Sequence, residues 1–124
     1  KSIPGSIQVY TIRIANQAGG TVDNNSIEIV DSIPANTVMC GLGSSVVTFQ
    51  NGTPSSGLTF NAAGNVSYSS TAGTPPVWGY TPAPDASGCD AAIRHIRIRP
   101  QGTMAGSGGS GNPYFEVSFR VKVL

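Results

Sequence analysis

The chain has 124 residues, which is enough for one domain with a single hydrophobic core and too few for two ordinary domains. Charged residues make up 10% of the chain and the formal net charge is +1, so no overall field favours nucleic acid or a membrane surface as a partner. The 16 Gly and 9 Pro residues are typical of a turn-rich β protein, and the recurring Ile, Val and Phe argue against disorder.

Period-two alternation predicts two strands near the start of the chain. The first covers residues 6–15, whose inner face holds Tyr10, Ile12 and Ile14. Ile7 and Val9 have the opposite phase, which predicts a bulge or a contact outside the core. The second strand covers residues 26–30, and Asp31 at its end is expected to accept backbone N–H bonds in the next turn.

The middle of the chain predicts short β segments separated by turns. We expect them over residues 37–40, 45–50, 58–61, 65–69 and 77–81. Residues 41–45 and the Asn51-Gly52 dipeptide predict turns, and residues 62–64 are expected to connect a hairpin. In the last of these segments Trp78 and Tyr80 share a face.

Two longer strands are predicted near the C-terminal end. Residues 92–99 place Ile96 and Ile98 inward and His95, Arg97 and Arg99 outward. Residues 101–112 are rich in Gly and Ser, which predicts a mobile and dispensable tip. The last strand has the clearest alternation: Phe115, Val117, Phe119, Val121 and Val123 against Glu116, Ser118, Arg120 and Lys122. About eight strands at this spacing indicate a β-sandwich.

The side chains that support catalysis or metal binding are few. His95 is the only histidine, and no paired-carboxylate or nucleophile motif accompanies it, so we expect no catalytic residues and no enzyme activity. The candidate calcium ligands, Asp23, Asp31, Asp85 and Asp90, do not form a ligand run and are expected to be solvated loop acids. The sequence therefore predicts neither a metal nor a cofactor.

A possible binding face emerges if the last two strands pair. Their outward residues then form a basic ribbon: His95, Arg97, Arg99, Arg120 and Lys122. Such a ribbon would suit an acidic glycan, a carboxylate-bearing protein or a neighbouring domain. The alternative is an ordinary solvated face, because charged outward positions are common. Nucleic acid is not expected, because aromatic residues do not interleave with these charges.

The stretch PGSIQVYTIRIANQAGG, followed by IEIVDSIPANT, resembles the signature of a bacterial surface repeat family, domain of unknown function eleven. SSGLTF, DAAIRHIRIRPQGTMA and FEVSFRVKV extend the resemblance over nearly the whole chain. It implies an all-β, immunoglobulin-like antiparallel sandwich of seven to nine strands without substantial helix. It also implies tandem copies in large exported proteins and no known catalysis.

These observations predict the domain organisation and the cellular location of the chain. We expect residues 1–124 to be a single immunoglobulin-like domain of a larger exported protein, because the chain starts without Met or a signal peptide. The expected location is extracellular, on the cell surface or in the periplasm, and no segment is expected to span the membrane. Cys40 and Cys89 are then predicted to form a disulfide, with two separate buried thiols as the alternative.

The predicted function is that of a non-catalytic spacer or adhesive repeat, with neighbouring domains of the same chain as partners. The alternative is a ligand-binding module for a glycan or a protein. That module would use the basic ribbon or the region of Trp78 and Tyr80.

Overall fold

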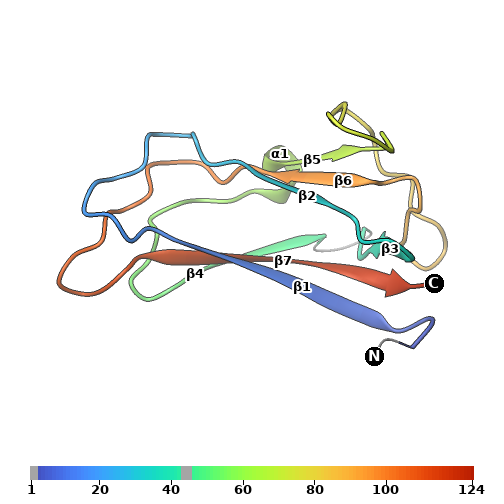
Figure 1. Ribbon diagram of the computed structural model, residues 1–124, viewed down its shortest axis with the longest axis horizontal. Coiled ribbons are helices and arrows are strands. Elements are labelled where there is room, and N and C mark those ends of the chain that lie inside the picture. The colour runs from blue at the N-terminus through green and yellow to red at the C-terminus, as the bar shows by residue number, and fades with distance from the viewer. Residues whose placement is uncertain (1–2, 43–45) are drawn as a thin grey trace.

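The larger of two sheets is built around β7 (Tyr114–Val123) in the computed structural model, which describes residues 3–42 and 46–124. β7 pairs on one side with β1 (Ile7–Ala15) and on the other with β3 (Thr37–Cys40) and β4 (Val47–Asn51). β4 lies beside the first half of β7 and β3 beside its second half. All these pairings are antiparallel, as Figure 1 shows.

The smaller sheet has the order β2-β6-β5 and is also antiparallel. Its strands are β2 (Ile29–Ser32), β6 (His95–Ile98) and β5 (Val66–Ser69). With the larger sheet it makes a two-layer β-sandwich of seven strands within the described residues, in agreement with the predicted all-β class. One helical turn, α1 (Ala62–Asn65), occurs among the described residues, and it is capped by Asn61, whose side chain accepts a bond from the Ala63 amide.

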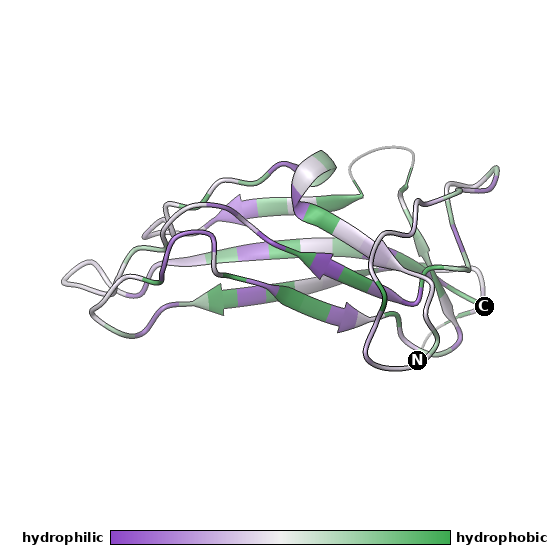
Figure 2. Ribbon diagram, turned by 90° about the horizontal axis from the view of Figure 1, so that it is seen from above, coloured by the Kyte–Doolittle hydropathy of each residue, from purple (hydrophilic) through white to green (hydrophobic). Residues whose placement is uncertain are grey.

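The core lies between the two sheets and is formed by the inward residues of both. Along β7 the predicted alternation is confirmed, and the hydropathy colours in Figure 2 alternate along the strands. The most deeply buried members are Met39, Ile93, Ile96, Ile98, Met104, Phe115, Val117, Phe119 and Val121. Tyr10 stacks on Phe119 with ring centroids 5.7 Å apart, and Phe49 stacks on Phe115 at 5.3 Å. Each such pair adds about 1 kcal/mol to the burial of its rings.

β1 is a regular strand and contains no bulge. Its register with β7 is continuous from Ile7 opposite Lys122 to Ala15 opposite Tyr114. Ile7 and Val9, at 53% and 63% exposure, face solvent on the outside of the sheet. Of the two predicted alternatives the bulge is therefore wrong, and the opposite phase of these two residues reflects an apolar outer surface.

Several predicted local structures differ from those observed. β2 starts at Ile29, so Asp31 lies inside the strand opposite Ile96 and not in a turn. The hairpin predicted around residues 62–64 is wrong: β5 pairs with β6, and a helical turn precedes it. Residues 77–81 are not a strand. Residues 1–2 lie outside the described residues, and so do residues 43–45, which the predictions assign to part of a turn.

Gly52 does not form the predicted tight turn. It continues the line of β4, and its amide donates to the Tyr114 carbonyl at 2.8 Å. A Cβ at this position would overlap the ring of Tyr114. Glycine is therefore required at this position, because the backbone lies too close to the Tyr114 ring for any side chain.

Residues 101–107 are not the predicted mobile tip. Met104 is 1% exposed and belongs to the core. The Val22 amide donates to the Met104 carbonyl at 3.0 Å, and the Ala105 amide donates to the Ser56 carbonyl at 2.9 Å. A Cβ on Gly106 would overlap the Gly19 carbonyl. This loop thus fills the end of the sandwich.

The two ends of the sandwich differ in content. One, which we call the chain-end pole, holds the start of β1 and the end of β7, where the Gly5 amide donates to the Val123 carbonyl at 2.6 Å. The opposite, loop pole is formed by residues 16–25, 52–57 and 101–112 (Figure 1). The two ends of the described chain therefore leave the domain at the same pole.

Candidate functional site

The predicted basic ribbon does not form, because its two strands belong to different sheets. β6 carries His95 and Arg97, followed by Arg99, in the smaller sheet, whereas Arg120 and Lys122 belong to β7 in the larger sheet. The five residues are therefore split between the two layers of the sandwich. The condition on which the ribbon depended, pairing of β6 with β7, is not met.

His95 is buried and not exposed as its outward phase predicts. Its exposure is 7%, and its Nδ1 atom has no hydrogen-bond partner among the described residues. Ile96 and Ile98 do point into the core as predicted. On the outer face of the same strand, Arg97 is also covered in part, by the ring of Trp78.

Arg97 is the centre of a small polar cluster on that outer face. The ring of Trp78 lies against its guanidinium, with the centroid 4.7 Å from Cζ. Nη1 is 3.6 Å from a carboxylate oxygen of Glu28, and Nη2 donates to the Ser67 hydroxyl at 3.3 Å. We call Trp78, Arg97, Glu28 and Ser67 the Arg97 cluster. Arg99, next in the outward phase, is exposed.

The chemistry of the Arg97 cluster is that of recognition and not of proton transfer. An aromatic ring, a guanidinium, a carboxylate and a hydroxyl are groups that contact sugars and carboxylates. Most of this capacity is used within the domain, since the Arg97 side chain is 18% exposed, forms an ion pair with Glu28 through Nη1 and donates to Ser67 through Nη2. Its Nε remains without a partner among the described residues.

Sequence reasoning named Trp78 and Arg97 but did not connect them with each other, nor with Glu28. The connection depends on the path of residues 70–80, which is irregular, and the alternation of Trp78 and Tyr80 predicted a strand that does not form. The useful sequence signal is the tryptophan itself, because a large ring in a Pro-rich loop needs a surface to cover.

Asp90 is a second buried polar centre, and its predicted role as a solvated loop acid is wrong. It is 6% exposed and accepts bonds from the Tyr80 hydroxyl at 2.7 Å, the Ala83 amide at 2.8 Å and the Ala92 amide at 2.9 Å. Burial by itself raises the pKa of the Asp90 carboxyl, but these three bonds outweigh it and the pKa is lowered. The hydrogen bond that Tyr80 donates to Asp90 raises the pKa of the Tyr80 hydroxyl. Asp90 thus anchors both sides of the loop around it.

The disulfide Cys40–Cys89 is present, as predicted. It joins the end of β3 to the residue before Asp90, and both cysteines are buried with Val38. Asp85 closes the preceding turn by accepting bonds from the Ser87 hydroxyl, the Cys89 amide and the Ser87 amide, which together lower the pKa of its carboxyl. The loop of residues 82–92 is therefore held by one covalent and several polar contacts.

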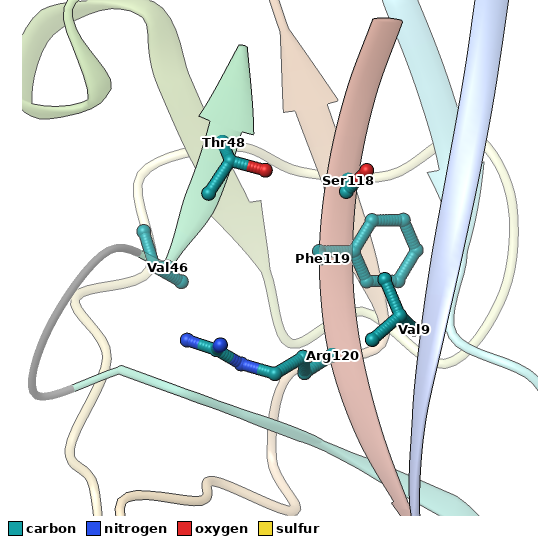
Figure 3. Close-up of a pocket in the computed structure, with 6 residues that line it drawn as sticks. All are labelled: Val9, Val46, Thr48, Ser118, Phe119 and Arg120. Atoms are coloured by element: carbon teal, nitrogen blue, oxygen red, sulfur yellow. The ribbon is translucent and has the colours of Figure 1, made fainter. Parts of the chain in front are cut away.

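Pockets open on the surface of the described residues at two places that bear on function. The first, about 50 Å³, lies on the outer face of the larger sheet and is lined by Val9, Val46, Thr48, Ser118, Phe119 and Arg120. Figure 3 shows the Arg120 side chain reaching below Val46 and away from the two hydroxyl groups. The second, about 290 Å³, lies at the chain-end pole and is lined by Ile33, Pro34, Ala35, Asn36, Thr37, Val38, Ala91, Ile93, Arg94 and Leu124. Neither lining brings a carboxylate together with a histidine or a nucleophile.

Two kinds of feature are absent from residues 3–42 and 46–124. No group of three or more His, Cys, Asp or Glu side chains lies close enough to hold a metal ion. None of the helical residues forms a segment long and apolar enough to cross a membrane.

Comparison of the chain with protein-family models, with curated proteins and with solved structures finds no match. The identification of a function therefore depends on the geometry described above and on the resemblance in the sequence signature.

Proposed function

We propose that this domain is a non-catalytic structural module of an exported bacterial protein, acting as an adhesive repeat or spacer outside the cytoplasm. One observation carries the proposal: the buried polar groups are used to hold the shape of the domain. Asp90 anchors the loop of residues 82–92, Arg97 holds Trp78 on the smaller sheet, and Cys40–Cys89 joins that loop to β3. These contacts stabilise long loops that have no secondary structure of their own.

The proposed location has two sources of support. Disulfides persist in oxidising compartments, which include the cell surface and the periplasm. The stretches PGSIQVYTIRIANQAGG and IEIVDSIPANT resemble an immunoglobulin-like repeat of bacterial surface proteins. Neighbouring domains of the same chain are the partners that this proposal implies.

The position of the chain ends favours an adhesive role over that of a linear spacer. Because Gly5 and Val123 are hydrogen-bonded neighbours, a longer chain would enter and leave the domain at one pole. Such a module adds little length between its neighbours and projects sideways from them. The loop pole, with residues 16–25, 52–57 and 101–112, would then be the part farthest from the parent chain.

A fusion of the domain between a donor and an acceptor fluorescent protein tests this geometry. We expect efficient energy transfer in the folded fusion and a loss of transfer in denaturant, because unfolding separates the two ends. A folded fusion with transfer as low as that of the unfolded one would contradict the projecting module.

A ligand-binding module is the second candidate, and a specific observation favours it. The Arg97 cluster combines an aromatic ring with a guanidinium whose side chain is 18% exposed, and the exposed Arg99 follows in the same outward phase. Its ligand would be a carboxylate-bearing glycan or protein. Of the five residues of the predicted basic ribbon, only Arg97 and Arg99 would belong to this binding site.

A glycan array together with a thermal-shift screen separates the two candidates. The structural module predicts no saturable binding. Saturable binding that is lost in the Arg97→Ala, Arg99→Ala double variant, but kept in Arg13→Ala on the other sheet, would replace the structural module by the binding module. Arg13 is a suitable control because it also contacts an aromatic ring and a carboxylate.

A further inference from the structure

β1 is an open edge of the larger sheet. Its strand pairing is with β7, and among the described residues no other strand or isolated bridge lies along its second side. Nine residues, Ile7–Ala15, form this edge in one regular strand. An edge of this length presents a row of backbone donors and acceptors to a partner.

The bonds to β7 show which backbone groups are directed away from it. The Ser6 carbonyl accepts from the Val123 amide, and the Asn16 amide donates to the Pro113 carbonyl, so even-numbered residues face β7. In an antiparallel ladder the alternate residues direct their N–H and C=O groups to the other side. These are the odd-numbered residues Ile7, Val9, Thr11, Arg13 and Ala15.

The edge lacks the usual protection against pairing. Proteins commonly block such edges with Pro, with bulges, with very short strands or with free charged side chains. β1 contains no Pro and no bulge, and its sequence IQVYTIRIA has a single charge, that of Arg13. Arg13 is held away from the edge by Glu116 at 2.8 Å and by the Tyr114 ring at 4.1 Å from its Cζ.

We propose that β1 pairs with β1 of a second copy of this chain, antiparallel and about a two-fold axis through Thr11. Because the outward backbone groups lie at residues 7, 9, 11, 13 and 15, they are symmetric about Thr11, and this register uses all of them. The two larger sheets then join into one continuous sheet. This pairing is independent of the place of the domain in a parent protein.

The side chains in this register are compatible on both faces. Outside, Thr11 meets Thr11 of the second copy, Val9 meets Arg13, and no two like charges are opposed, since Arg13 is the only charged residue of the strand. Inside, Tyr10 meets Ile12 of the second copy and Ile14 meets Gln8. Tyr10, Ile12 and Ile14 are only half-buried at the open edge, so pairing removes further apolar surface from water.

Sedimentation velocity from about 10 µM to about 1 mM tests the proposal, a range that detects dissociation constants up to the millimolar level. The sensitive variants are Val9→Lys and Val9→Glu. In the proposed register the introduced lysine opposes Arg13 twice in each dimer, whereas the introduced glutamate complements Arg13 twice. We expect the Val9→Lys dimer to be on the order of tenfold weaker than the Val9→Glu dimer.

Two further measurements make the test specific. Thr48→Lys adds the same charge on the same face of the sheet, but on β4, and is expected to leave association unchanged. Val9→Pro removes an edge N–H, which edge strands tolerate, and is expected to abolish association. In amide exchange, residues 7, 9, 11, 13 and 15 should become protected as concentration rises.

The outcomes are distinct. A dimer that responds to the Val9 variants and not to Thr48→Lys, with protection of the odd-numbered amides, supports the pairing. The pairing is overturned if the chain stays monomeric at about 1 mM. It is also overturned if a dimer forms whose dissociation constant does not change with the Val9 substitutions, or in which these amides remain in fast exchange.

Discussion

Met104 provides a direct test of the role of the loop at residues 101–107. The Met104→Ala variant removes the side chain beyond Cβ at a position that is 1% exposed and packed in the core. Buried Met→Ala changes of this kind cost about 2–5 kcal/mol, because transfer energy is lost and a cavity remains. Since Met104 lies at the end of the sandwich, where the loop is able to relax, we expect about 2–3 kcal/mol.

Urea unfolding with the disulfide intact measures this change as a shift of the midpoint at constant slope. In a domain of this size the same loss lowers the thermal midpoint by roughly 10 °C. Thr103→Ala, next to it in the same loop but exposed, is the matched control and is expected to change stability by less than about 0.5 kcal/mol. A Met104→Ala variant as stable as Thr103→Ala would refute the conclusion that the loop is part of the core.

Two further predictions concern the loop of residues 82–92. The Asp90 carboxylate, with its lowered pKa, contributes stability that is fully present above its unfolded pKa of about 3.9 and is lost as pH falls through its folded value. The stability gap between the wild type and Asp90→Asn should therefore be largest near neutral pH and shrink in acid, and a gap that is constant with pH would contradict this. Replacing Cys40 and Cys89 by Ala removes a link across 49 residues and should cost about 4 kcal/mol in the chain-entropy account. Equilibrium unfolding of the double variant measures the cost, and a loss below about 1 kcal/mol would argue that the polar contacts of the loop are sufficient without the bridge.

The alternation of apolar residues in the sequence determined which face of each regular strand is buried. It was sufficient for β7 from Phe115 to Val121, where every second residue enters the core, and for Tyr10, Ile12 and Ile14 in β1, whereas Val123 at the end of β7 is only partly buried. It also identified the β-sandwich class. The two cysteines predicted a disulfide only together with the expected export of the domain, and the structure decides for the bridge over two separate thiols.

The alternation of apolar residues does not specify which strands pair with each other. The predicted binding site, the basic ribbon, depended on such a pairing. The basic ribbon required β6 beside β7, whereas the tertiary structure places them in opposite layers. Pairing is decided by long-range packing of the whole core, which has no local signature.

Irregular segments were decided by tertiary structure alone. Glycine-rich residues 101–112 predict mobility, but Met104 is drawn into the core because the end of the sandwich would otherwise remain open. Trp78 meets Arg97 because its irregular segment returns to the outer face of the smaller sheet, and His95 is buried although its phase in the strand is outward. The sequence by itself thus determined the faces of the strands, and only the packing of loops on those faces determined the polar clusters.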